Sequence, residues 1–204
     1  KYRVSYSRIE MISEIDDIDH PSVRNCLKLL EVDDSLTITH DGEMPAMSGV
    51  GSSSSFTVGL LNALYHKKGI KLSSKDLALQ AIHVEQHLNK ESVGIQDQIT
   101  AAYGGINKIT AGLGPEWEVE PVNISEEYIK EMEDHILLGF SGKNRIAEVQ
   151  SRKQVEQIGK NKNYLNEIMD VANMGIRYIE EESDIEKVSS MLKAIWKFKK
   201  QLGI

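Results

Sequence analysis

The 204-residue chain has little of what marks several classes of protein. Its single cysteine, Cys26, cannot form an internal disulfide, which excludes a disulfide-stapled mini-protein. No run of about 18 apolar residues and no charged-then-apolar leader occurs, so neither membrane spanning nor secretion has support. Hydrophobic residues make up 40% of the chain and charged residues 27%, which excludes intrinsic disorder and collagen-like repeats. We therefore expect a folded protein of the reducing cytoplasm.

The charge balance limits the partners of the chain. There are 24 Lys and Arg against 31 Asp and Glu, which gives a net charge of −7. This charge disfavours unselective attraction to a nucleic-acid backbone or to an anionic membrane. We expect no nucleic acid and no membrane as partner, and any anionic ligand must be held by local geometry.

Periodicity predicts an α+β layout, with strands and helices first and helices last. Strands are expected at 2–6, 36–39, 106–110, 117–121 and 136–140. Helices are expected over 21–31, 56–68, 74–88 and 95–103, and from Arg145 onward with a break near 181–184.

A loop rich in small residues, 45–55, runs without a break into the apolar helix predicted from Phe56. Glycines let backbone N–H groups approach a ligand, and the helix that follows offers unpaired N–H groups, so the loop is typical of an anion site. A flexible Gly/Ser connector is the alternative. The P-loop pattern G-x-x-x-x-G-K-[ST] is absent. The dinucleotide-binding pattern G-x-G-x-x-G begins at Gly49 but is not completed, because Ser54 occupies the position of its third glycine.

The loop resembles the second motif, P-x-x-x-G-L-G-S-S-A-A, of the GHMP kinase superfamily, through Pro45-x-x-x-Gly49-Val50-Gly51-Ser52-Ser53-Ser54-Ser55. Two further segments, His83-Val84-Glu85 and Gly94-Ile95-Gln96-Asp97-Gln98, follow in the family's order. They are most similar to the D-glycero-D-manno-heptose 7-phosphate kinase branch. The resemblance covers the chain from Lys1 to the Arg145 region and fades in the last helices.

The resemblance implies a domain organisation. A GHMP kinase N-terminal α/β domain, similar to the second domain of ribosomal protein S5, is expected over 1–122. The start of the C-terminal domain, mainly helical, is expected over 123–204. The family's first and third motifs have no counterpart, so we expect a chain truncated at both ends and unable to turn over substrate alone, without an identified basic partner for Asp97.

The resemblance also implies a function: ATP- and Mg²⁺-dependent phosphorylation of a sugar hydroxyl, best matched to the anomeric hydroxyl of D-glycero-D-manno-heptose 7-phosphate. A kinase for fucose, galactose or a uronic acid, and a non-catalytic relative that binds nucleotide or sugar, are the alternatives. The implied site residues are Asp97 as catalytic base; Pro45, Gly49, Val50, Gly51, Ser52, Ser53, Ser54 and Ser55 for the nucleotide; Ser53 and Glu85 for the metal; and Gly94, Gln96, Tyr103 and Arg145 for the sugar.

Physical arguments single out the two carboxylates. Glu85 lies beside an apolar stripe of its helix, where burial of an ionised carboxylate is unfavourable unless a cation or a hydrogen-bond donor binds it. The alternative is that the Glu85 carboxylate reaches solvent. Asp97 falls in the first turn of a helix, which favours the carboxylate, and simple capping is its alternative. His83 and His87 lack the ligand set of a zinc site and are expected to be solvated.

Overall fold

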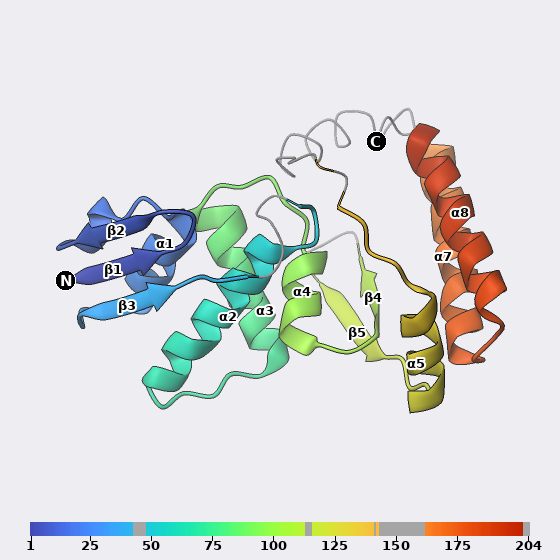
Figure 1. The fold of residues 1–204 in the computed structure, drawn as a ribbon, viewed down its shortest axis with the longest axis horizontal. Coiled ribbons are helices and arrows are strands. Elements are labelled where there is room, and N and C mark those ends of the chain that lie inside the picture. The colour runs from blue at the N-terminus through green and yellow to red at the C-terminus, as the bar shows by residue number, and fades with distance from the viewer. Residues whose placement is uncertain (43–47, 113–115, 141, 143–161, 202–204) are drawn as a thin grey trace. The chain divides into compact units, whose positions relative to one another are not determined.

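The computed structural model describes residues 1–42, 48–112, 116–140, 142 and 162–201. These residues form two compact units, the first made of Lys1–Gly104 with Gly142 and the second of 105–140 and 162–201. Both mix helices and strands, which confirms the α+β class (Figure 1). The domain boundary expected at residue 122 stays a prediction. Within the described ranges, no helix has the length and apolar character needed to cross a membrane.

The first unit begins with a three-stranded sheet in the order β2-β1-β3. Its strands are β1 (Tyr2–Ser5), β2 (Ile9–Ile12) and β3 (Leu36–Thr39). β1 pairs antiparallel with β2 and parallel with β3, so that Val4 lies opposite both Glu10 and Ile38. Alternation buries Tyr2 and Val4 on one face, as the period of a strand requires. No strand was predicted at the position of β2.

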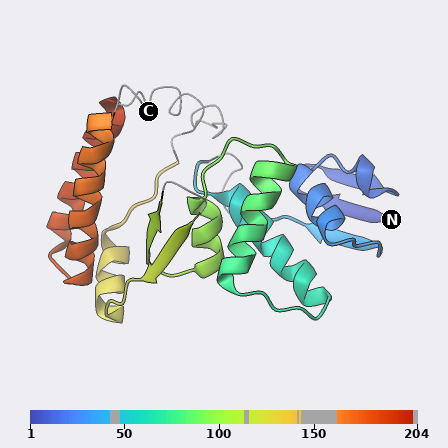
Figure 2. The ribbon, with the colours of Figure 1, turned by 180° about the vertical axis from the view of Figure 1, so that it is seen from behind.

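Helices fill the rest of the first unit. After the short 3₁₀ helix η1 (Ile15–Asp17), they are α1 (Pro21–Leu29), α2 (Ser52–Lys67), α3 (Ser74–Ile82), the π-helix η2 (His83–Leu88) and α4 (Gln96–Tyr103). α2 contacts α1, α3 and α4 (Figure 2). The sequence sets the starts of α1 and α3, because Pro21 holds the first position of α1 and the Ser73 hydroxyl accepts a hydrogen bond from the N–H of Asp76 at 3.1 Å.

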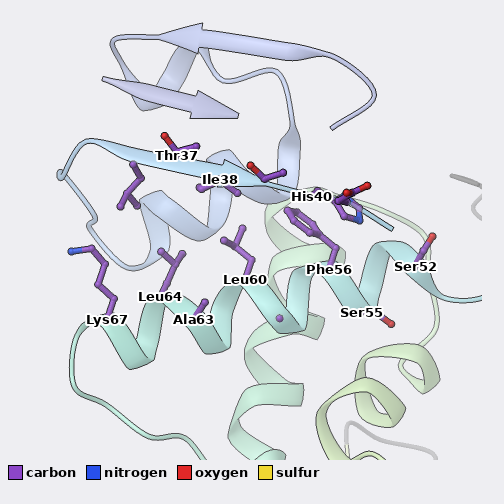
Figure 3. Close-up of a pocket in the computed structure, with 14 residues that line it drawn as sticks. Thr37, Ile38, His40, Ser52, Ser55, Phe56, Leu60, Ala63, Leu64 and Lys67 are labelled. Carbon is purple, nitrogen blue, oxygen red and sulfur yellow. The ribbon is translucent and has the colours of Figure 1, made fainter. Parts of the chain in front are cut away.

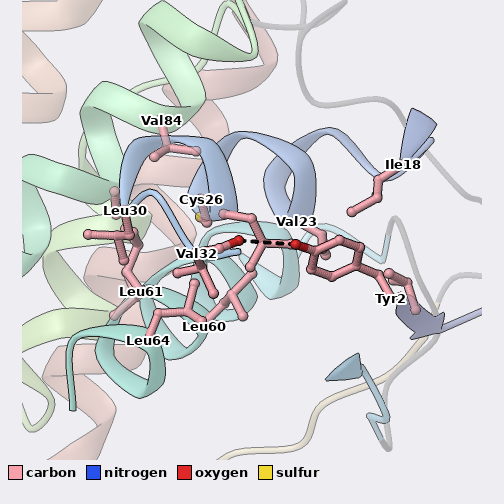
Figure 4. Packing of buried hydrophobic residues seen from close by; sticks show 14 of the residues in the cluster. Tyr2, Ile18, Val23, Cys26, Leu30, Val32, Leu60, Leu61, Leu64 and Val84 are labelled. Carbon is pink, nitrogen blue, oxygen red and sulfur yellow. Dashed lines mark hydrogen bonds between the residues drawn. The ribbon is translucent and has the colours of Figure 1, made fainter. Parts of the chain in front are cut away.

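Apolar side chains of β1, α1 and α2 form one core in this unit (Figure 4). Leu27 of α1 and Leu61 of α2 are fully buried in it, and the Tyr2 hydroxyl donates a hydrogen bond to the carbonyl of Val32 at 3.2 Å. Cys26 lies in the same core. Burial, with a further contribution from the charge of Glu85, raises the pKa of this thiol to about 12, so Cys26 stays protonated.

Two helices that carry predicted site residues differ in extent from the prediction. α2 begins at Ser52 rather than Phe56, so the serines placed in the loop form its first turn. The reason is local: serine is well tolerated at a helix start, and Gly51 turns the chain into the helix with a φ of +72°. The helix predicted over 74–88 is interrupted, because its last part, His83–Leu88, widens into a π-helix.

The second unit holds the two-stranded antiparallel sheet of β4 (Asn107–Ala111) and β5 (Trp117–Pro121), with helices α5 (Glu126–His135), α7 (Lys162–Glu180) and α8 (Ile185–Gln201). α7 and α8 pack along each other (Figure 1). Gly175 lets the side chain of Met191 pack on its backbone. The Tyr128 hydroxyl donates to the carbonyl of Ser183 at 2.6 Å and so joins α5 to the turn between these helices. The break predicted at 181–184 is therefore confirmed.

The strand predicted at 136–140 is wrong. These residues, all of which the structure describes, form neither helix nor strand, and Leu137 is 96% exposed. Alternating or continuous apolar character predicts a strand only where a partner strand supplies the hydrogen bonds, and the described part of the chain supplies none here.

Candidate functional site

The turn that leads into α2 holds two glycines in the left-handed region of backbone space. Gly49 has a φ of +80° and Gly51 a φ of +72°, which glycine adopts without steric penalty. Gly51 is the residue that precedes α2, and it provides no side chain to cap the helix. The first N–H groups of an α-helix lack intrahelical partners and attract anions. This end of α2 is therefore equipped to receive a phosphate.

The carboxylate of Asp97 lies directly against the backbone of Gly51. A Cβ atom added to Gly51 would lie 3.2 Å from Cγ of Asp97 and 3.3 Å from its Oδ2. Asp97 is exposed in the first turn of α4, where Ile95 rather than Asp97 holds the N-cap position. The carboxylate thus lies beside the N-terminal end of α2, and Asp97 is not the N-cap residue of its own helix.

Glu85 is the second carboxylate next to this loop, and it is only 1% exposed. It lies within the π-helix η2, a local widening that is rare and often found at functional sites. Its Oε2 accepts a hydrogen bond from Ser54 Oγ at 2.8 Å and another from Nε2 of Gln98. The alternative in which this side chain reaches solvent is therefore excluded.

The other oxygen of this carboxylate has no hydrogen-bond partner among the described residues. Oε1 of Glu85 is buried and accepts no hydrogen bond from any described residue, and the same holds for Oε1 of Gln98. An unpaired buried acceptor is costly, and more so when it carries charge. A cation or a bound water would relieve this cost.

The residues present fit a magnesium ion. Mg²⁺ binds through one or two carboxylates, substrate phosphates and water rather than through a full protein cage. Among the described residues there is no group of three or more His, Cys, Asp or Glu that could hold a metal ion. Glu85 supplies the carboxylate, and the end of α2 beside it is suited to phosphates. His83 and His87 are exposed, as expected.

The structure separates Ser53 and Ser54 more sharply than the sequence does. Ser54 is buried against Glu85, whereas the side chain of Ser53 is exposed at the start of α2. The metal role expected for Ser53 with Glu85 stays a prediction. Two residues in contact with Glu85, Ser54 and Gln98, were not assigned to the metal. A signal for the burial of Gln98 was present, because Gln98 lies three residues after Ile95 and four before Ala102, on an apolar side of the helix.

The residues expected to bind sugar are placed in part. Gly94 lies just before α4, and Gln96 is the first residue of this helix. Both are exposed and lie within three residues of Asp97 in the chain. Tyr103 ends α4, six residues beyond Asp97 and thus about 9 Å along the helix axis. Pro45 and Arg145 lie outside the described residues. The exposed Val50 lies in the turn before α2.

A groove of about 660 Å³ starts beside the first turn of α2 and follows β3 (Figure 3). Its floor is largely apolar, and Ser52 and Ser55 line the end nearest the loop. At that end the rings of His40 and Phe56 stack with centroids 4.1 Å apart and planes inclined by 18°. The groove therefore offers aromatic and aliphatic surface directly beside the N-terminal end of α2.

Comparison with known families decides the identity of this segment. Residues 22–105 match the GHMP kinases N terminal domain. The matched stretch contains the loop, Glu85 and Asp97. Residues 22–105 are thus similar to the N-terminal domain of GHMP kinases. The resemblance read from three short motifs is confirmed by this match, which extends over a continuous stretch of the chain.

Curated proteins similar to this chain include three sugar kinases. An L-arabinokinase from Arabidopsis thaliana is 30% identical over 79 residues, which are 39% of this chain and 8% of that protein. A bifunctional fucokinase/GDP-fucose pyrophosphorylase from the same plant is 25% identical over 173 residues, 82% of this chain and 16% of that protein. A D-glycero-alpha-D-manno-heptose 7-phosphate kinase from Campylobacter jejuni is 28% identical over 120 residues, 59% of this chain and 34% of that protein.

A solved structure has the same fold. It is a D-glycero-D-manno-heptose 1-phosphate kinase from Bacteriodes thetaiotaomicron, with a TM-score of 0.73 and 19% sequence identity. The match covers 98% of this chain and 63% of that one. The chain thus spans less than two thirds of the length of each of these relatives.

Proposed function

We propose that the protein transfers the γ-phosphoryl group of ATP to a hydroxyl of a sugar. One observation carries the proposal: the exposed carboxylate of Asp97 and the buried carboxylate of Glu85 both meet the loop and first turn of α2, at Gly51 and Ser54 respectively. An anion site flanked by one exposed and one buried carboxylate has the parts that phosphoryl transfer needs.

ATP is expected to bind with its phosphates at residues 49–55. Gly49 and Gly51 allow close approach of the backbone, and the uncapped end of α2 favours negative charge. The groove along β3 begins at Ser52 and Ser55 and provides apolar and aromatic surface, which suits a purine base connected to phosphates at the loop.

Glu85 is the residue expected to hold Mg²⁺, together with the Ser53 hydroxyl. Its unpartnered Oε1 is the ligand atom available to the ion. When bound, Mg²⁺ neutralises charge on the phosphate oxygens during transfer. The protein's own contribution is to hold this carboxylate in place away from bulk water, since Glu85 is 1% exposed and its Oε2 accepts hydrogen bonds from Ser54 and Gln98.

Asp97 is expected to act as the general base. Its carboxylate accepts the proton of the attacking sugar hydroxyl while the hydroxyl oxygen forms its bond to the γ-phosphorus and ADP leaves. The contact with the Gly51 backbone fixes this carboxylate beside the expected phosphate position. Positioning of base, nucleophile and phosphate is the main task of the protein in such a reaction.

The sugar is proposed to be a heptose phosphate, with phosphorylation at the anomeric hydroxyl. Support comes from the resemblance of residues 94–98 to the heptose kinase branch and from the Campylobacter jejuni relative. Gly94, Gln96, Tyr103 and Arg145 are the residues proposed to contact it. Fucose and arabinose are the competing acceptors, because two plant relatives are named for them.

A panel of acceptors tests the proposed function in the full-length protein. D-glycero-D-manno-heptose 7-phosphate, fucose, arabinose, galactose and galacturonic acid are each incubated with Mg-ATP, and products are followed by ADP release and phosphorus NMR. We expect transfer to the heptose phosphate, with a new phosphorus signal coupled to the anomeric proton. Transfer to none of the sugars, despite binding of ATP, would instead favour the non-catalytic relative.

Glu85→Gln tests the proposed metal ligand. The substitution keeps shape but removes the negative charge, so the Mg²⁺ concentration that gives half-maximal activity should rise about tenfold or more, and ATP binding should weaken chiefly in the presence of metal. Both quantities are measured by titrating Mg²⁺ at fixed ATP. Glu10→Gln is the matched control, because Glu10 is also buried and hydrogen-bonded, to Tyr6 and to the Asp19 N–H. Equal metal dependence of both variants would make Glu85 structural.

A further inference from the structure

Two side chains hold the same oxygen of Glu85. Ser54 Oγ donates to Oε2 at 2.8 Å, and Nε2 of Gln98 donates to the same atom. Ser54 is 5% exposed and Gln98 1% exposed, so neither bond competes with bulk water. Because both donors act on one oxygen, the carboxylate group is fixed in rotation as well as in position, and its second oxygen is left without a described partner.

The two donors come from helices that also carry other parts of the proposed site. Ser54 belongs to the first turn of α2, directly after Ser53, and Gln98 follows Asp97 in the first turn of α4. Glu85 itself lies in the π-helix between α3 and α4. The three side chains therefore join α2, η2 and α4 at the point where phosphate, metal and base are expected.

We infer that Ser54 and Gln98 are positioning residues for the cation: by binding Oε2 of Glu85 they hold Oε1 in the direction of a divalent ion at the end of α2. The inference rests on the proposed function and deepens it. Donors behind a ligating carboxylate orient it and raise its affinity for metal. Ser54 stands where the general second motif of the superfamily, P-x-x-x-G-L-G-S-S-A-A, has alanine.

A second consequence concerns Gln98 alone. Its amide nitrogen is bound to Glu85, and its amide oxygen is buried without a described partner. Rotation of the Gln98 amide group would break the hydrogen bond from its nitrogen to the Glu85 carboxylate. The amide oxygen is therefore held in a fixed direction and is a second oxygen acceptor near Glu85. A water molecule of the ion's hydration shell is the donor that suits this oxygen.

Manganese binding tests the inference without reliance on turnover. The full-length protein and its Ser54→Ala and Gln98→Leu variants are saturated with a non-hydrolysable ATP analogue, and free Mn²⁺ is measured by electron paramagnetic resonance. Each variant should bind Mn²⁺ about tenfold more weakly than the parent, and its affinity for the analogue should fall more in the presence of metal than in its absence. Tyr2→Phe is the control, because it also removes a buried hydroxyl, the donor to Val32, but no contact with Glu85.

The outcomes separate the inference from the proposed function. If the parent binds Mn²⁺ and both folded variants bind it equally well, the positioning role is wrong and Glu85 acts without it. If the parent binds neither Mn²⁺ nor the analogue, the proposed function fails and the positioning role fails with it. Thermal unfolding shows which variants are folded. If Gln98→Leu does not fold, the Mn²⁺ affinity of Ser54→Ala alone tests the positioning role, because this substitution introduces the alanine of the general family motif.

Discussion

Replacement of Asp97 by asparagine is expected to lower turnover of the full-length protein by about 10²-fold or more, with little change in ATP affinity. The reason is that asparagine keeps the size of the side chain but cannot accept the proton of the sugar hydroxyl in the transition state. Its contact with the Gly51 backbone is expected to remain, so the phosphate site should be preserved. Steady-state kinetics at saturating sugar, with ATP binding measured by calorimetry, provide both quantities.

The control for this prediction is Asp16→Asn. Asp16 is an exposed carboxylate of the same unit that pairs with Lys28 on the surface, so the substitution removes one negative charge away from the loop. It should leave turnover unchanged. If Asp97→Asn also leaves turnover unchanged, another group removes the proton and the assignment of the base is wrong.

Gly51→Ala is expected to lower turnover by a comparable factor, of about 10²-fold, through geometry rather than chemistry. At a φ of +72° a Cβ atom strains the backbone by roughly 1–2 kcal/mol. The same atom would lie 3.2 Å from Cγ of Asp97, so the carboxylate or the loop must shift. A displacement of the base by a fraction of an ångström to an ångström is enough for a loss of this size.

Gly49→Ala separates strain from displacement. Gly49 also has a positive φ, of +80°, but a Cβ added there would meet nothing within 4 Å. Both variants should therefore lose similar stability in thermal unfolding, and Gly51→Ala should lose clearly more turnover. Equal losses of turnover would show that backbone strain in the loop, and not the contact with Asp97, explains the effect.

The sequence predicted the parts of this site that depend on local chemistry. Glycines at 49 and 51 require no tertiary information, and neither does the placement of Asp97 in the first turn of a helix. The sequence did not determine the burial of Glu85, because helical spacing placed this residue beside an apolar stripe but left its carboxylate free to reach solvent. In the structure Glu85 is buried, with 1% of the residue exposed.

The features that the sequence missed depend on contacts between distant segments. Ser54 and Gln98 meet Glu85 across 31 and 13 residues of chain, and no local pattern reports such a meeting. The π-helix around Glu85 was missed because a one-residue widening leaves the apolar spacing almost unchanged. The strand expected at 136–140 failed for the converse reason, since its apolar residues met no partner strand in the described chain.

The central claim is that residues 49–55, Glu85 and Asp97 form a single site for phosphoryl transfer. A crystal structure of the protein with Mn²⁺ and a non-hydrolysable ATP analogue tests it most directly, because the anomalous signal of manganese locates the ion independently of the chain. We expect the manganese peak within coordination distance of the Glu85 carboxylate, the phosphates against the N–H groups at the start of α2, and the terminal phosphate on the side that faces Asp97. A nucleotide bound elsewhere, or a manganese ion that contacts the phosphates but not Glu85, would contradict the account.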